Sequence, residues 1–235
     1  MSFSNEWDER YQENTHMSIW PWSDLVSLVM KYKPQKEKFK VLELGCGYGA
    51  NIPLFSSLGV DYYAVDGSET IVRKLHQKYP QYNDNIFVGD FTESIPDQKF
   101  DLIIDRAALT HNSEQAIKES LNACHKQLID GGKFIGVDWF SDQCSDYAKG
   151  EMTEDIWTKS NFNESHFSDV GKTHFSNEEH LLGLFEKFKI LSMTHKISSE
   201  KIPNNDWTLA TWNFVAEKVV SVSYTHLTLP TNREV

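Results

Sequence analysis

The sequence predicts an α/β fold in which a parallel sheet is covered by helices on both faces. Short runs rich in β-branched and aromatic residues alternate with segments whose apolar residues recur at helical spacing. One run leads into a turn with three alternating glycines, and acidic residues follow several of the runs. Parallel strands joined by helical crossovers produce this alternation, and open α/β sheets bind ligands at the carboxyl ends of their strands.

A helix precedes the predicted sheet. The segment Pro21–Tyr32 has Trp22, Leu25 and Val29 at helical spacing, and proline is favoured in a first helical turn. The preferred interpretation of Trp22 is therefore ordinary packing on the apolar face of this helix.

The sheet itself follows, with helical segments between its strands. Ser68 is a suitable N-cap for one helix, which Pro80 prevents from continuing. Another helix is expected over Glu114–Leu128, ending before the pair Gly131-Gly132. The first five predicted strands are Phe39–Leu44, Val60–Val65, Asn85–Val88, Phe100–Asp105 and Lys133–Trp139.

The last third of the chain predicts a helix and two more strands. Ser176 and Glu179 have the spacing of a capping box at a helix start. Strands are expected over Phe188–Lys196 and Leu209–Val220. Residues 140–175 are aromatic and polar without a clear period, which suggests an insertion over the end of the sheet.

Composition and charge limit the possible partners. The 235 residues are 40% hydrophobic, which fits one core-forming domain, and the formal net charge is -11. Such a surface repels phosphate backbones and acidic lipids but suits a cationic ligand, so we expect neither a nucleic acid nor a membrane partner. The three cysteines and nine histidines show no metal-ligand spacing, so no metal is expected. The amino terminus lacks a signal-peptide pattern, and a cytoplasmic location is expected.

The last fifteen residues look foreign to the fold. The string SVSYTHLTLPTNREV follows the strand that should close the sheet and has no obvious packing role. Part of it resembles one reading frame of a sequencing adapter. We therefore expect residues 221–235 to be a non-native tail.

The strongest motif is the run from Val41 to Ala50, in which a buried strand meets Gly45, Gly47 and Gly49. Glycine is needed where the backbone turns sharply or where a ligand lies against the main chain. The loop alone is not specific, because it also fits the G-x-G-x-x-G/A pattern of dinucleotide-binding proteins. A glycine turn with no ligand is the remaining interpretation.

Three carboxylates accompany the glycine loop. Glu43 lies on the strand just before it, Asp66 ends the second strand, and Asp90 follows the third. Each of them alone would be an ordinary strand or turn residue. Together they should gather at the carboxyl edge of the sheet.

This arrangement resembles the class I S-adenosylmethionine-dependent methyltransferases over residues 18–218. Glu43 and the glycines resemble the first motif of that family, Asp66 its ribose-binding acid, and Asp90-Phe91 its adenine-side pair. The resemblance implies a Rossmann-like, doubly wound, seven-stranded sheet with an antiparallel last strand in a three-layer αβα arrangement. It also implies a helical lid over residues 1–38 and a cofactor-binding domain over residues 39–220.

The resemblance further implies S-adenosylmethionine as the cofactor and a set of residues around it. A sulfonium with an ammonium group suits an acidic pocket better than a pyrophosphate would. The expected cofactor-binding residues are Glu43, Gly45, Cys46, Gly47, Asp66, Gly67, Asp90, Phe91, Asp105 and Arg106.

Methyl transfer from a sulfonium is an in-line displacement in which the protein chiefly supplies alignment and, for some acceptors, a base. His111 and Asp105, near the end of the fourth strand, are the expected catalytic residues; the alternative for His111 is a residue at a helix entry. The expected substrate residues are Tyr11, His16, Trp20, Asp138 and Trp139. The segment from Asp105 to Leu109 has a weaker local resemblance to thiopurine-type methyltransferases, and Phe175–Leu191 to the tellurite-resistance type.

Methyl transfer to an oxygen, nitrogen or sulfur atom of a small molecule is the leading functional hypothesis, for a monomer or homodimer. A nicotinamide-dependent oxidoreductase remains open because the glycine loop fits that pattern too. A non-catalytic S-adenosylmethionine-binding scaffold remains open because the sequence has no unambiguous base. The Asn-Pro-Pro-Tyr-type signature of amino methyltransferases is absent after the fourth strand, which lowers the expectation of base or glutamine methylation.

Overall fold

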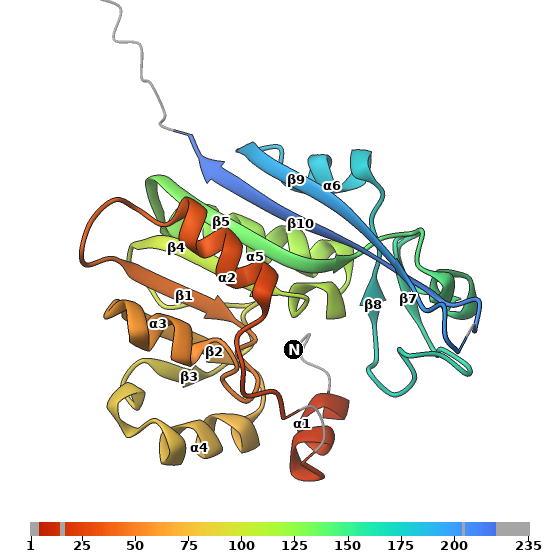
Figure 1. The fold of residues 1–235 in the computed structure, drawn as a ribbon, viewed down its shortest axis with the longest axis horizontal. Coiled ribbons are helices and arrows are strands. Elements are labelled where there is room, and N and C mark those ends of the chain that lie inside the picture. The colour runs from red at the N-terminus through yellow and green to blue at the C-terminus, as the bar shows by residue number, and fades with distance from the viewer. Residues whose placement is uncertain (1–4, 15–16, 204, 220–235) are drawn as a thin grey trace, which may run out of the picture.

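The computed structural model describes residues 5–14, 17–203 and 205–219, and it contains a seven-stranded sheet (Figure 1). The strand order is β3-β2-β1-β4-β5-β10-β9. Strands β1 to β5 are parallel, and β10 is antiparallel to both of its neighbours. The strands are β1 (Lys40–Leu44), β2 (Asp61–Asp66), β3 (Ile86–Val88), β4 (Phe100–Arg106), β5 (Leu128–Phe140), β9 (Phe188–Ser199) and β10 (Thr208–Lys218). The predicted mixed sheet with an antiparallel last strand is confirmed.

Helices cover both faces of this sheet, as predicted. On one face lie α2 (Ser23–Tyr32), α3 (Ile52–Leu58) and α4 (Glu69–Lys78), whose apolar residues share a core with those of β1, β2 and β4. On the other face lie α5 (Glu114–Gln127) and α6 (Glu178–Leu184), packed against Phe134 and Phe214. The order of the strands reverses between β1 and β4, which is where open α/β sheets leave a crevice for a ligand.

Residues beyond β5 form a cap at the end of the sheet, in agreement with the expected insertion. The cap contains a three-stranded antiparallel sheet of β6 (Glu151–Met152), β7 (Thr158–Ser160) and β8 (Thr173–His174). A small apolar core of its own includes Phe162, Phe167 and Phe175. Helix α1 (Asn5–Gln12) lies beside α4, near the same end of the sheet (Figure 1).

Several predicted boundaries differ from the structure; strand β9, for example, extends three residues past its predicted end, to Ser199. The pair Gly131-Gly132 does not end the element before it but lies inside β5, where the pairing with β4 jumps from Leu128 to Lys133 and leaves a four-residue excursion. The N-cap of α6 is Asn177, whose side chain accepts from the N–H of His180, and not Ser176. Strand β10 ends at Lys218, two residues before the predicted end.

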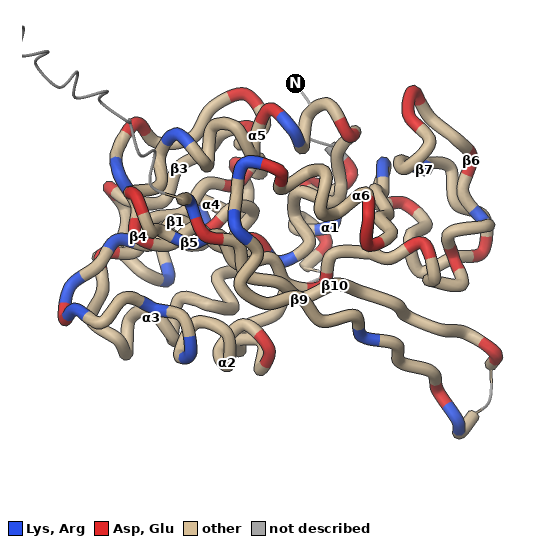
Figure 2. The backbone as a smooth tube through the Cα atoms, turned by 90° about the horizontal axis from the view of Figure 1, so that it is seen from above, with Lys and Arg blue, Asp and Glu red and all other residues tan. Residues whose placement is uncertain are grey.

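The charged residues and the long hairpin define the outer surface. Figure 2 shows Lys and Arg dispersed among Asp and Glu, and the β9–β10 hairpin extending away from the body of the molecule. Three short 3₁₀ helices complete the described chain: Pro80–Tyr82, Leu109–His111 and Ser145–Lys149. Within the described part, no helix is both long and apolar enough to cross a bilayer.

Candidate active site

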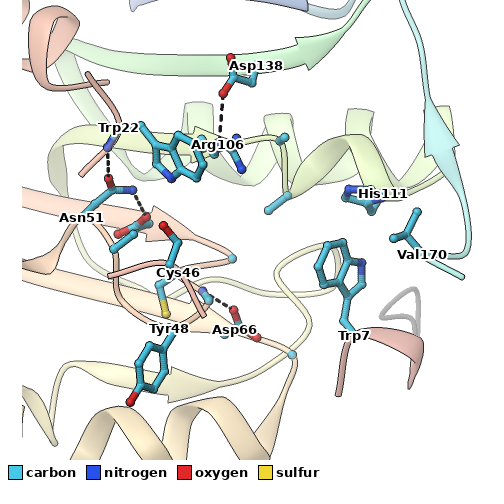
Figure 3. Close-up of a pocket in the computed structure, with 18 of the residues that line it drawn as sticks. Trp7, Trp22, Cys46, Tyr48, Asn51, Asp66, Arg106, His111, Asp138 and Val170 are labelled. Carbon is cyan, nitrogen blue, oxygen red and sulfur yellow. Dashed lines mark hydrogen bonds and ion pairs between the residues drawn. The ribbon is translucent and has the colours of Figure 1, made fainter. Parts of the chain in front are cut away.

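A cavity of about 760 Å³ opens at the carboxyl ends of the parallel strands, between α1 and the cap (Figure 3). Among the described residues, its lining includes five carboxyl groups, from Asp24, Glu43, Asp66, Asp90 and Asp138, but only two permanent cations, Arg106 and Lys196. Nine of the expected cofactor-binding residues line it: Glu43, Gly45, Cys46, Gly47, Asp66, Gly67, Asp90, Phe91 and Arg106.

The glycine loop turns tightly beneath this cavity. Gly45 has a φ of +63°, and a Cβ on it would lie 2.3 Å from the Cβ of Ala108. Its N–H donates to the carbonyl of Val65 at 2.8 Å, so the loop is fixed to the end of β2. Gly47, with a φ of +50°, has its α-carbon beneath the hydroxyl of Tyr11, which would lie 3.2 Å from an added Cβ. Both positions require a residue without a side chain.

Asp66 is held by the backbone around it. Its Oδ2 accepts the N–H of Gly47 at 2.9 Å and its Oδ1 accepts the N–H of Ser68 at 3.0 Å. Burial raises the pKa of Asp66 to about 6, against the opposing effect of the two N–H donors. A carboxylate fixed in this way can accept hydroxyl groups from a ligand at its remaining lone pairs.

Glu43 lies deeper, at the end of β1. Its carboxyl group accepts the phenolic hydroxyl of Tyr62 at 2.5 Å and the side-chain amide of Asn51 at 2.7 Å. Burial raises the pKa of Glu43 to about 7, while these two hydrogen bonds oppose the shift. A bound cation would favour the ionised form of this group. Asn51 also lines the cavity but was not predicted from the sequence, because an Asn after a glycine turn is an ordinary loop residue.

Asp90 and Phe91 follow β3 at the other end of the lining. Oδ1 of Asp90 accepts the N–H of Thr92 at 2.9 Å and its hydroxyl at 2.6 Å. Phe91 is buried, and its ring lies 3.6 Å from the position of a Cβ on Gly45. The pair therefore offers a carboxylate and an aromatic ring side by side.

Asp105 does not reach the cavity, contrary to the expectation that it is catalytic and touches the cofactor. It is 0% exposed; one oxygen accepts the N–H of Leu109 at 2.9 Å and the other the indole N–H of Trp139 at 2.6 Å. Burial raises the pKa of Asp105 to about 7. Through these hydrogen bonds, Asp105 stabilises the turn after β4.

A charged wall lies opposite the glycine loop. Nε of Arg106 donates to Oδ2 of Asp138 at 3.1 Å, and the guanidinium carbon lies 3.7 Å from the centre of the Trp22 ring (Figure 3). Asp138 has a φ of +57°, and its N–H donates to the side chain of Asn213 at 2.8 Å, where the pairing of β10 with β5 is irregular. Asn213 in turn donates to Asp24, which also pairs with Lys196. Trp22 therefore lines the cavity, and its interpretation as a mere packing residue was wrong.

His111 faces the cavity from the turn after β4, as expected. Its Nδ1 lies 3.1 Å from the carbonyl oxygen of Lys172, and its ring meets the edge of Trp7 at 5.0 Å and of Phe140 at 5.8 Å. A carbonyl oxygen can only accept, so Nδ1 bears the proton and Nε2 the lone pair in the neutral ring. This is the arrangement that a general base needs.

The expected substrate residues are only partly brought together. Tyr11 and Asp138 line the cavity. Trp20 is 73% exposed and does not line it, and Trp139 is 1% exposed in the core beneath it. His16 lies outside the described residues, as do the residues of the expected tail. Among the described residues, no group of three or more potential metal-binding side chains is found.

The lining fits S-adenosylmethionine better than a dinucleotide. The cavity is predominantly acidic, and the Gly47 N–H that could meet a pyrophosphate donates to Asp66 instead. A cofactor with a net positive charge, a ribose and an adenine meets fixed carboxylates and an aromatic ring here, whereas phosphates would meet repulsion.

Comparison with known proteins agrees with this chemistry. The methyltransferase domain family matches residues 42–136. A phosphoethanolamine N-methyltransferase of Plasmodium falciparum is 25% identical over 204 residues, covering 73% of this chain and 77% of that relative. An mRNA cap guanine-N(7) methyltransferase of Schizosaccharomyces pombe is 29% identical over 126 residues, covering 47% of this chain and 35% of that relative.

Similarity to solved structures supports the fold. An S-adenosylmethionine-dependent methyltransferase from Methanosarcina mazei has a TM-score of 0.67 at 17% identity, covering 86% of this chain and 99% of that one. The family match, together with the acidic cavity, decides against a nicotinamide-dependent oxidoreductase and against a non-catalytic scaffold. Residues 42–136 thus match the methyltransferase domain family, and the chain is an S-adenosylmethionine-dependent methyltransferase with the fold of class I of these enzymes.

Proposed function

We propose that the enzyme methylates a small-molecule acceptor and that His111 is the general base. The observation on which this rests is the hydrogen bond from His111 Nδ1 to Lys172, which directs the lone pair of Nε2 away from the backbone, in a ring that lines the cavity. S-adenosylmethionine supplies an electrophilic methyl group on its sulfonium. His111 Nε2 would accept the proton that the acceptor atom loses as its bond to the methyl carbon forms and the methyl–sulfur bond breaks, with S-adenosylhomocysteine as the leaving group.

The cofactor half of the cavity is assigned to the loop and strand ends. Asp66 accepts the ribose hydroxyls, and Asp90 with Phe91 holds the adenine. Glu43 compensates the positive charge of the methionine portion, while Gly45, Cys46, Gly47 and Gly67 let the backbone approach it. The support is that the carboxylates of these residues are buried or half-buried and already oriented by hydrogen bonds, so little ordering is needed on binding.

The acceptor half has two walls of different character. Trp7, Phe140, Phe167, Val170 and Leu209 offer an apolar, mostly aromatic wall. The opposite wall is the Arg106–Asp138 pair under Trp22, followed by Asp24 and Lys196. This combination fits a small molecule that has both an apolar portion and a polar group, because the aromatic surface supplies affinity and the ion pairs fix orientation.

The distribution of charge favours a small acceptor over a nucleic acid. The phosphoethanolamine methyltransferase that this chain resembles is named for a small acceptor, and the cap methyltransferase for an RNA end. The predominantly acidic lining and the dispersed basic residues offer no continuous path for a phosphate backbone (Figure 2). We infer a cytoplasmic location. Of the lid expected over residues 1–38, α1 fits that role because Trp7 and Tyr11 line the cavity, whereas the apolar side of α2 packs on the sheet.

The test is a screen of fractionated metabolites, with a capped RNA oligonucleotide as a separate arm, read out as S-adenosylhomocysteine release. Release with a metabolite fraction and not with RNA is expected. His111→Gln should then lower kcat by about 100-fold, the low end of general-base contributions, with unchanged cofactor affinity. His76→Gln is the matched control, because His76 also hydrogen-bonds a backbone carbonyl but lies on α4 and does not line the cavity. Full activity of His111→Gln would remove His111 from the mechanism, and release with RNA alone would overturn the small-molecule assignment.

A further inference from the structure

A second cluster of polar side chains lies in the cap, outside the active-site cavity. The imidazole nitrogens Nε2 of His174 and His180 are 3.0 Å apart. Nδ1 of His174 lies 2.9 Å from the hydroxyl of Thr158, and that hydroxyl lies 2.9 Å from Oδ2 of Asp155. His174 and Thr158 are both buried, so each of these contacts must be a satisfied hydrogen bond.

The direction of every proton in this chain of contacts is determined. The carboxylate of Asp155 can only accept, so the Thr158 hydroxyl donates to it. The same hydroxyl oxygen must then accept from Nδ1–H of His174. Burial, together with the adjacent His180, lowers the pKa of His174 to about 3, so this ring is neutral and its Nε2 accepts from Nε2–H of His180.

At the Asp155 end, this series of hydrogen bonds reaches the start of α5, close to His111 in the sequence. Oδ2 of Asp155 also accepts the N–H of Glu114 at 3.0 Å, at the first residue of α5. Burial would raise the pKa of Asp155, but the Glu114 N–H and the Thr158 donors lower it below its usual value, so it stays an acceptor. Glu114 follows His111 by three residues, and only the extended residues Asn112 and Ser113 separate the 3₁₀ turn that ends at His111 from the start of α5.

At the other end, His174 is connected to His111 through the backbone of its own strand. Lys172, whose carbonyl accepts from His111, immediately precedes β8, and His174 is the second residue of β8. Strand β8 pairs with β7 so that Thr158 lies opposite His174. The segment from His111 to Glu114 is thus held at two points, by the carbonyl of Lys172 just before β8 and by the carboxylate of Asp155 just before β7. The His174–Thr158–Asp155 bonds link these two points.

We propose that His174, Thr158 and Asp155 form a positioning relay that fixes the Nδ1–H tautomer and the ring orientation of His111. His180 donates to Nε2 of His174, and the His180 ring stacks on Trp157 with 4.1 Å between the ring centres. The relay residues do not line the active-site cavity, so their effect on catalysis is an indirect one, through the position of His111. Its consequence for turnover rests on the proposed role of His111 as the base.

The relay can be tested without an acceptor by long-range ¹H–¹⁵N spectra of the histidine rings. The expected neutral tautomers are Nδ1–H for His111 and His174 and Nε2–H for His180. Thr158→Val should replace the single His111 tautomer by a mixture, and Thr158→Ser, which keeps the hydroxyl, should restore it. Thr173→Val is the matched control, because the buried hydroxyl of Thr173 on β8 has no hydrogen-bond partner among the described residues.

A second variant covers the case in which Thr158→Val does not fold. His180→Phe keeps a ring to stack on half-buried Trp157 but removes the donor to His174 Nε2. It should shift the Nε2 signal of His174 while this ring keeps its Nδ1–H tautomer, because Thr158 and Asp155 still fix it. An Nε2–H tautomer of His111 in the wild type, or unchanged His111 and His174 signals in both variants, would overturn the relay.

Turnover separates the relay from the identity of the base. With an acceptor found by the screen, Thr158→Val should lower kcat by about tenfold at unchanged cofactor affinity, as expected for a misplaced catalytic group. If His111→Gln is fully active while the ring spectra respond as expected, the relay stands and the base assignment fails.

Discussion

The N–H of Gly47 donates to Oδ2 of Asp66 at 2.9 Å, and this bond joins the glycine loop after β1 to the end of β2. One carboxylate therefore shapes the loop and also faces the cavity. Loss of its charge should weaken cofactor binding both directly and through the loop.

Asp66→Asn should raise the Kd for S-adenosylmethionine by about tenfold or more, because charged hydrogen bonds are roughly twice as strong as neutral ones. Isothermal titration calorimetry measures this change. Asp61→Asn is the control, since Asp61 is an exposed acid at the opposite end of the same strand. An unchanged Kd for Asp66→Asn would refute the ribose assignment.

The raised pKa of Glu43, about 7, should make stability and binding depend on pH. Below pH 4.5 the carboxyl is protonated in both the folded and the unfolded chain. Between pH 4.5 and 7 only the folded chain keeps the proton, so the contribution of Glu43 to the free energy of unfolding falls as the pH rises.

A cationic cofactor favours ionised Glu43 and should therefore release protons when it binds near pH 6.5. Calorimetry in buffers of different ionisation enthalpy measures this release. Glu43→Gln should reduce it, while the remainder comes from Asp66, whose pKa is about 6. Equal proton release by the wild type and Glu43→Gln would show that Glu43 does not respond to the cofactor.

Two glycines with nearly the same φ separate backbone strain from steric conflict. Gly59, at +64°, has no atom within 4 Å of an added Cβ, whereas Gly45, at +63°, would meet Ala108 at 2.3 Å. Gly59→Ala should cost about 1 kcal/mol of unfolding free energy, the usual penalty for the left-handed region. Gly45→Ala should cost about 2 kcal/mol more, because the ends of β1 and β4 must separate. Chemical denaturation compares the two, and equal costs would contradict the close approach of the loop to Ala108.

The sequence was sufficient for the sheet and for the acids that follow its strands. Alternating buried runs and helical segments leave few topologies, and a residue directly after a parallel strand falls at its carboxyl edge whichever way the side chain points. Asp66 and Asp90 were predicted for that reason and line the cavity.

Side-chain direction within a strand was the part that the sequence could not supply. Asp105 and Arg106 are adjacent, so they point to opposite faces of β4; Asp105 points to Trp139 under the α5–α6 layer and Arg106 into the cavity. Trp22 was misassigned because the sequence pattern of a Trp at helical spacing is the same in two cases: when the ring packs on the core, and when it stacks on an arginine, here Arg106 of β4.

The amino-terminal helix should control release of the cofactor through Asp8. Its carboxylate accepts from the hydroxyls of Ser68 and Thr70 at the start of α4, directly after Asp66. Asp8→Asn should speed hydrogen exchange of the α1 amides and raise the S-adenosylmethionine off-rate by about fivefold or more, because these charged hydrogen bonds hold α1 on α4. Glu9→Gln is the control, since Glu9 is exposed on the same helix. Equal off-rates for the two variants would show that α1 does not retain the cofactor.

Substitutions of Asp138 should show that the strained backbone of β5 at this residue serves the acceptor site. With a φ of +57°, it occupies a region that costs a side chain about 1 kcal/mol. Asp138→Gly relieves that strain and loses a partly exposed ion pair with Arg106 worth about 0–1 kcal/mol, so the unfolding free energy should stay nearly constant.

Activity should nevertheless fall in Asp138→Gly. Without the carboxylate, the Arg106 guanidinium under Trp22 loses the partner that fixes its orientation, and the KM for the acceptor should rise by about tenfold while the Kd for the cofactor does not change. Asp138→Asn tolerates the same backbone conformation. Its KM for the acceptor should lie between those of the wild type and Asp138→Gly, because the amide keeps a hydrogen-bonding oxygen without the charge. A large loss of stability in Asp138→Gly with unchanged KM would mean that Asp138 serves the fold and not the acceptor.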